Sequence, residues 1–158
     1  MDRLLAVLSY IPRALILILM VTLLIDMMLG VFFRYVVGHA LPWSEEVGTF
    51  CLIWLTFVGG AVGIVRHSHF SIELAIDNLE PKLRLICQVL VALLIAIAGA
   101  IVAYNGWLLV LANSTSEMPS LGFSLAFQYA ASVVGGLLMM WYAGVLALRL
   151  LRAGDGGV

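Results

Sequence analysis

Long stretches without a single charge limit what this chain can fold into. One runs from Leu85 to Ser116 and another from Val47 to Val65. A helix needs about 20 apolar residues to cross the hydrocarbon core of a bilayer. The composition agrees, because 64% of the 158 residues are apolar and only 11% are charged, too few to cover a water-soluble domain of this length. The sequence therefore predicts an all-α integral membrane protein.

Four segments are long enough to span, and we expect them to form a single membrane domain of residues 1–158. Two further segments are expected to lie in the membrane interface. Residues 2–11 have leucines at helical spacing before Pro12, which should break or kink the chain. Residues 71–80 carry acids on one face and apolar side chains on the other, which predicts a short amphipathic helix, with an irregular loop as the alternative. The expected spans are about 13–35, 43–66, 82–112 and 124–149.

The distribution of basic residues predicts the orientation in the membrane. Of the eight lysine and arginine residues, only Arg34 falls at the end of the spans opposite to the termini. The positive-inside rule then places both termini, and the amphipathic segment between the second and third spans, in the cytoplasm. Arg34 and the segment Leu41 to Glu46 are expected on the outer side.

The segment Trp43-Ser44-Glu45-Glu46 concentrates polar groups at the start of the second span. Ser44 is a candidate N-cap, which would place both glutamates in the first helical turn, where the helix dipole favours negative charge. Trp43 suits the aromatic belt of the interface. Arg34 can pair with one glutamate, which leaves the other acid without a partner in the hairpin. We therefore interpret the segment as an anchored helix hairpin and a possible contact for another protein, rather than as a catalytic pair.

Asp26 is a carboxylate inside a predicted span, and such residues are functional candidates by default. Two interpretations of Asp26 remain. It takes part in ion or proton coupling, or it has a structural role in which a hydrogen-bonded Asp26 holds the first helix against a neighbour. The histidines argue against a haem cofactor, because His39, His67 and His69 all fall in loops outside the predicted spans. No cofactor and no metal site is expected.

Several motifs, in order, resemble the DctQ-like small membrane subunit of tripartite ATP-independent periplasmic (TRAP) transporters. The resemblance covers nearly the whole chain and includes its length and four helices. The motifs are Phe33-Arg34-Tyr35, Pro42-Trp43-Ser44-Glu45-Glu46, Gly59-Gly60-Ala61 and the run from Arg66 to Glu73. Within the run from Arg66 to Glu73, the resemblance marks Arg66, His69 and Glu73 as structural or partner-contact candidates.

The resemblance implies a non-catalytic scaffold in the bacterial inner membrane rather than an enzyme. Its expected partners are a large membrane subunit, which carries the substrate and sodium sites, and a periplasmic binding protein that delivers an organic acid. A self-sufficient four-helix transporter with Asp26 as its coupling residue is the alternative. The two readings differ in whether the chain alone can move a solute.

Overall fold

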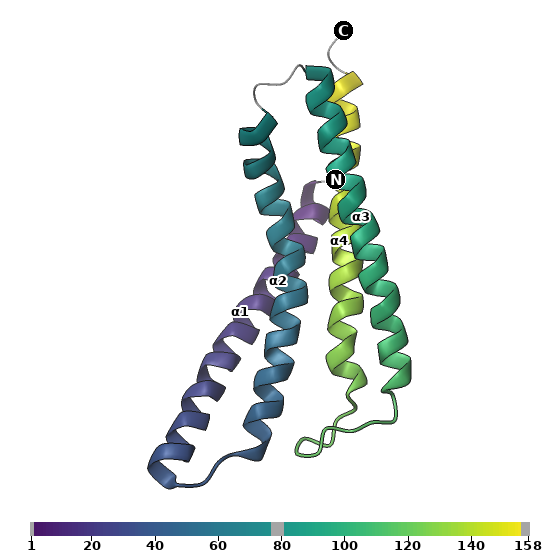
Figure 1. Ribbon diagram of the computed structural model, residues 1–158. Helices are drawn as coiled ribbons and strands as arrows, with labels where there is room; N and C mark the ends of the chain where they lie inside the picture. Colours follow the sequence, from purple (N-terminus) through teal and green to yellow (C-terminus); the bar gives the residue numbers. More distant parts are fainter. Residues whose placement is uncertain (1, 77–80, 156–158) are drawn as a thin grey trace.

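The computed structural model of the chain is an arrangement of long helices (Figure 1). It describes the backbone of residues 2–76 and 81–155, and the side chains of residues 10–63, 83–148 and 150. The helices are α1 (Asp2–Phe32), a π-helical turn η1 (Phe33–Val37), α2 (Pro42–Ile76), α3 (Pro81–Ala112) and α4 (Ala126–Asp155). Four helices are long and apolar enough to cross a membrane, as predicted, at Tyr10–Val37, Pro42–Gly63, Leu83–Ala112 and Ala126–Leu148.

Two predicted helix boundaries are not observed. Residues 2–11 do not form a separate segment, because α1 continues through Pro12 to Phe32. Proline removes one helix hydrogen bond but has a helical φ, so a helix can continue through it. Likewise α2 runs past Arg66 to Ile76 without a break, so the first part of the expected amphipathic segment belongs to α2. Residues 77–80 lie outside the described residues, and an interfacial location for either segment stays a prediction.

The helices pack in the spatial order α1, α2, α4, α3 (Figure 1). The most extensive interface joins α3 to α4, and smaller ones join α1 to α2 and α2 to α4. The α1–α2 turn and the loop at residues 113–125 lie at one end of the molecule, and the end of α2 and the start of α3 lie at the other. A hydrogen bond of 3.2 Å from Trp54 Nε1 to the Phe127 carbonyl oxygen also links α2 to α4.

Glycines of α4 bring its backbone close to both neighbours. A Cβ at Gly136 would lie 2.6 Å from the Gly99 carbonyl oxygen on α3. A Cβ at the adjacent Gly135 would lie 2.9 Å from the Phe57 carbonyl oxygen on α2. Adjacent helix positions point about 100° apart, so two consecutive glycines can serve two different interfaces. By contrast, a Cβ at Gly59 or Gly63 of α2 would meet nothing within 4 Å.

Most large apolar side chains in the described part of the chain face outward. Leu17, Met28, Leu93 and Trp107 are examples from α1 and α3, and each is more than half exposed. The largest fully buried side chain is only a valine, Val58. In water such a surface would aggregate, whereas in lipid it is solvated, and close packing of small residues holds the helices together. The fold is therefore that of a multi-pass membrane protein.

Candidate functional site

The polar turn between α1 and α2 is built by residues that end one helix and begin the next. Gly38 has φ of 76°, a left-handed conformation that terminates the helix at low cost for glycine. The His39 amide then donates to the Phe33 carbonyl oxygen at 3.1 Å. Pro42 begins α2, where its missing N–H costs nothing. The short connection holds Arg34 and Glu45 on facing helix ends.

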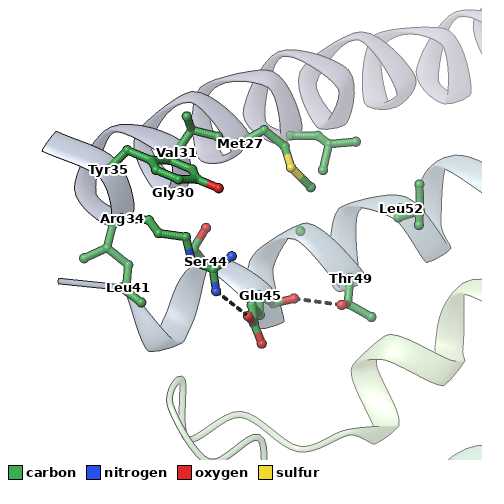
Figure 2. Close-up of a pocket in the computed structure, with 13 residues that line it drawn as sticks. Met27, Gly30, Val31, Arg34, Tyr35, Leu41, Ser44, Glu45, Thr49 and Leu52 are labelled. Atoms are coloured by element: carbon green, nitrogen blue, oxygen red, sulfur yellow. Dashed lines mark hydrogen bonds and ion pairs between the residues drawn. The ribbon is translucent and has the colours of Figure 1, made fainter. Parts of the chain in front are cut away.

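Arg34 and Glu45 flank the rim of a groove between α1 and α2 (Figure 2). A guanidinium nitrogen of Arg34 lies 3.9 Å from a carboxylate oxygen of Glu45, and the two side chains are 61% and 87% exposed. The predicted pairing is therefore present, as a long and solvated ion pair of the kind that contributes little to stability. The groove has a volume of about 540 Å³, and Leu23, Met27 and Leu52 are among the apolar residues that line it.

Glu46 points to a different part of the chain. Its carboxylate accepts hydrogen bonds from the backbone N–H groups of Ser120, at 2.9 Å and 3.2 Å, and of Leu121, at 2.9 Å. Both donors belong to the 113–125 loop, which is shaped by a left-handed Gly122 and by the buried side chain of Met118. Hydrogen bonds to an ionised carboxylate are the stronger kind. Glu46 therefore ties the start of α2 to the loop between α3 and α4.

Two expectations about this segment are wrong. We expected one glutamate to lack a partner, but Glu45 pairs with Arg34 and Glu46 binds the 113–125 loop. A pairing between residues so far apart in the chain leaves no local sequence signal. We also expected Ser44 to be the N-cap, but α2 begins at Pro42, so Ser44 lies inside the first turn. Its hydroxyl oxygen lies 2.9 Å from where a Cβ of Gly30 would be, which marks close packing of α1 against α2.

The other predicted residues are not gathered into one site. Trp43 is about one-third exposed, and it is not among the residues that line the groove. Arg66, His69 and Glu73 lie on α2, but their side chains are outside the described ones, so their roles stay predictions. Among the residues that the structure describes, no group of three or more His, Cys, Asp or Glu could hold a metal ion.

Asp26 is buried between α1 and α2, with 3% of its surface exposed. One of its carboxylate oxygens lies 3.2 Å from where a Cβ of Gly48 would be. Neither oxygen has a hydrogen-bond partner in the described part of the chain. The residue thus packs against α2, but the hydrogen bond that we expected to hold the helices together is not observed. Gly48, which leaves room for this carboxylate, was not identified from the sequence.

Replacing Asp26 with leucine is expected to stabilise the purified chain. A buried polar group without a partner costs about 1–3 kcal/mol, and leucine has a similar shape without that cost. Asp26→Asn is the matched control, because it keeps two polar atoms in the same place and should bring no gain. Thermal unfolding in detergent measures both variants. A fall in unfolding temperature for Asp26→Leu would show that the carboxylate makes a stabilising contact after all.

The fold and this polar end define a helical membrane protein with four candidate spans. The comparison with protein families then identifies it. A family model described as "Tripartite ATP-independent periplasmic transporters, DctQ component" matches residues 22–153. The chain belongs to this family: it is a TRAP transporter small permease subunit, and the family is not enzymatic.

Individual relatives agree with the family match. Two Haemophilus influenzae proteins described as TRAP transporter small permease proteins are 25% identical over 123 residues and 26% identical over 104 residues. These matches cover 78% and 66% of this chain, and 74% and 63% of the relatives. The sialic acid TRAP transporter small permease protein SiaQ of Vibrio cholerae is 30% identical over 110 residues, which cover 68% of this chain and 62% of SiaQ. The chain thus spans less than two thirds of two of these relatives.

Proposed function

We propose that the chain is a scaffold subunit that braces the large membrane subunit of a TRAP transporter in the inner membrane. In this proposal the large subunit carries out sodium-coupled uptake of an organic acid, which a periplasmic binding protein delivers. The observation that carries the proposal is the family match over residues 22–153. The name of one relative includes sialic acid, which is an organic acid, and this supports the substrate class.

The geometry of the membrane helices supports a role without a transport site of its own. Coupled transport sites are usually built from interrupted helices and converging polar groups near the middle of the membrane. Here the four long helices are continuous across their candidate spans, apart from the π-helical turn that ends the first span. Asp26 and Ser132 are the buried polar residues of the described side chains, and they lie in different interfaces. Among the described side chains, no second buried carboxylate, hydroxyl or amide lies beside Asp26 to support the alternative, in which this chain alone transports with Asp26 as the coupling residue.

The orientation is part of the proposal. With both termini in the cytoplasm, as the basic residues predict, the α1–α2 turn and the 113–125 loop face the periplasm together. Glu46 then holds these two segments as one surface on the side from which a binding protein would arrive. In this proposal the surface presents a docking site for the binding protein or for the large subunit.

Reconstitution in liposomes tests the proposed function. The chain alone is expected to move no solute under a sodium or proton gradient. Uptake should require the large subunit, the binding protein and an inward sodium gradient together. Solute movement by the chain alone would overturn the scaffold role. A loss of uptake in Asp26→Asn, with normal assembly of the complex, would favour the alternative in which Asp26 is the coupling residue.

A further inference from the structure

The groove between α1 and α2 changes in polarity along its length. Its rim, at the turn between the helices, carries the polar side chains of Arg34, Ser44 and Glu45 (Figure 2). Further from the turn it is lined by apolar side chains that include Leu23, Met27 and Leu52. A phospholipid has the same order of groups along the membrane normal, with a polar headgroup followed by acyl chains. The groove therefore matches a lipid in the order of its polar and apolar groups.

The two charges at the rim have unused binding capacity. Among the described residues, the ion pair of 3.9 Å is the only polar interaction of either side chain. An arginine side chain has five N–H donors, and a carboxylate has about four acceptor positions. Both side chains are mostly exposed, so a ligand can reach them without displacing a part of the chain. A cation and an anion beside each other can receive a ligand that carries both charges.

We propose that this groove binds a phospholipid whose headgroup carries a phosphate and a primary ammonium group, as in phosphatidylethanolamine. Arg34 donates hydrogen bonds to the phosphate, and Glu45 accepts from the ammonium. One acyl chain lies along Leu23, Met27 and Leu52. The proposal holds whichever side of the membrane this end faces, and it does not depend on sodium coupling or on the solute.

The charges favour a lipid over a helix of a partner protein as the occupant. A partner helix with an apolar face would remove Arg34 and Glu45 from water, and the desolvation of such a pair can exceed the attraction between its charges. A lipid headgroup instead keeps both charges at the hydrated interface and pairs each with an opposite charge. Occupation by the large subunit is an outcome that the test below can reveal.

Native mass spectrometry of the full chain from nanodiscs of defined lipid mixtures tests the charge pairing. The chain is expected to retain phosphatidylethanolamine in preference to phosphatidylcholine, whose quaternary ammonium has no N–H to donate, and to phosphatidylglycerol, whose headgroup has no ammonium.

Variants of the two charged residues test which contact gives this preference. Losing one charge-assisted contact corresponds to about a tenfold reduction in affinity. Arg34→Gln should therefore weaken retention of all three lipids, and Glu45→Gln should remove the preference for phosphatidylethanolamine. Glu117→Gln, an exposed acid outside the groove, is the matched control. Equal retention of the three lipids by the wild-type chain would overturn the proposal.

A steric variant tests the acyl-chain part of the groove. Leu52 is 57% exposed in the groove, and Leu137, on α4 and outside it, is 55% exposed. Both side chains are more than half exposed, so neither tryptophan variant should unfold the chain. Leu52→Trp should lower lipid retention and Leu137→Trp should not. Equal retention by the two variants, or loss of the lipid when the chain is copurified with the large subunit, would contradict the proposal, and the second result would identify the groove as a protein interface.

Discussion

Replacing Glu46 with glutamine is expected to lower the unfolding temperature (Tm) of the purified chain by about 4–8 °C, because hydrogen bonds to a charged group contribute about 2 kcal/mol. The carboxylate accepts from two backbone N–H groups of the 113–125 loop, at Ser120 and Leu121. A glutamine keeps one acceptor oxygen, but its NH₂ group would face a backbone N–H donor. The 113–125 loop should then detach from the start of α2. Thermal unfolding in detergent gives the Tm, and limited proteolysis of this loop reports its detachment.

Glu45→Gln is the matched control for this experiment. It removes the same charge from the neighbouring residue, but the Glu45 side chain is mostly exposed and its ion pair with Arg34 is long. A solvated pair of this kind contributes about 0–1 kcal/mol, so the Tm should change by no more than about 2–4 °C. Equal shifts in the two variants would show that the 113–125 loop is not held by Glu46. If the two outer segments form one docking surface, Glu46→Gln should also reduce uptake by the assembled transporter more than Glu45→Gln does.

A methyl group at Gly136 should be more damaging than the loss of the Glu46 hydrogen bonds. The added Cβ would lie 2.6 Å from both the Gly99 carbonyl oxygen and the Ala103 backbone nitrogen of α3. Backbone atoms cannot rotate away as a flexible side chain can, so the two helices must separate. We expect Gly136→Ala to cost about 3 kcal/mol and to lower the Tm by about 6–12 °C. Size-exclusion chromatography should show loss of the monodisperse peak.

Gly144→Ala is the control for Gly136→Ala on the same helix. A Cβ there would meet nothing within 4 Å, so the variant adds the same methyl group without a clash. Its Tm should stay at or slightly above the wild-type value, because alanine has the higher helix propensity. A wild-type Tm for Gly136→Ala would contradict the close approach of α3 and α4 that the structure describes. Gly135→Ala, whose Cβ would clash with the Phe57 backbone, extends the test to α2.

The number of helices and the membrane class could be predicted from the sequence because both depend on local composition. Helix ends were less predictable. Pro12 and the polar residues after Arg66 suggested breaks, but the helices continue because neither a proline nor a group of polar residues by itself ends a helix. The structure, and not the sequence, shows that Gly136 faces α3 while Gly59 and Gly63 face open space.

The candidate site could be predicted in part. Arg34 was expected to pair with one of the two glutamates because the turn between them is short, and the structure shows that it pairs with Glu45. The contact of Glu46 with Ser120 and Leu121 could not be predicted, because it depends on how two helix hairpins meet. The surroundings of Asp26 depend in the same way on the position of α2, which brings Gly48 against it. In both cases the sequence identified the residue but not its neighbour.

The pairing of α1 with α2 and of α3 with α4 has a consequence for how the chain is made. Each hairpin joins helices that follow one another in synthesis, so each can form as soon as its second helix leaves the ribosome. Among the described residues, the contacts of α2 with α4 must wait for the last helix, and the contact of Glu46 must wait for the 113–125 loop. Biogenesis is therefore expected to proceed by insertion of two hairpins and to end with their lateral association. Glu46, at the start of α2, then links the first hairpin to the 113–125 loop of the second.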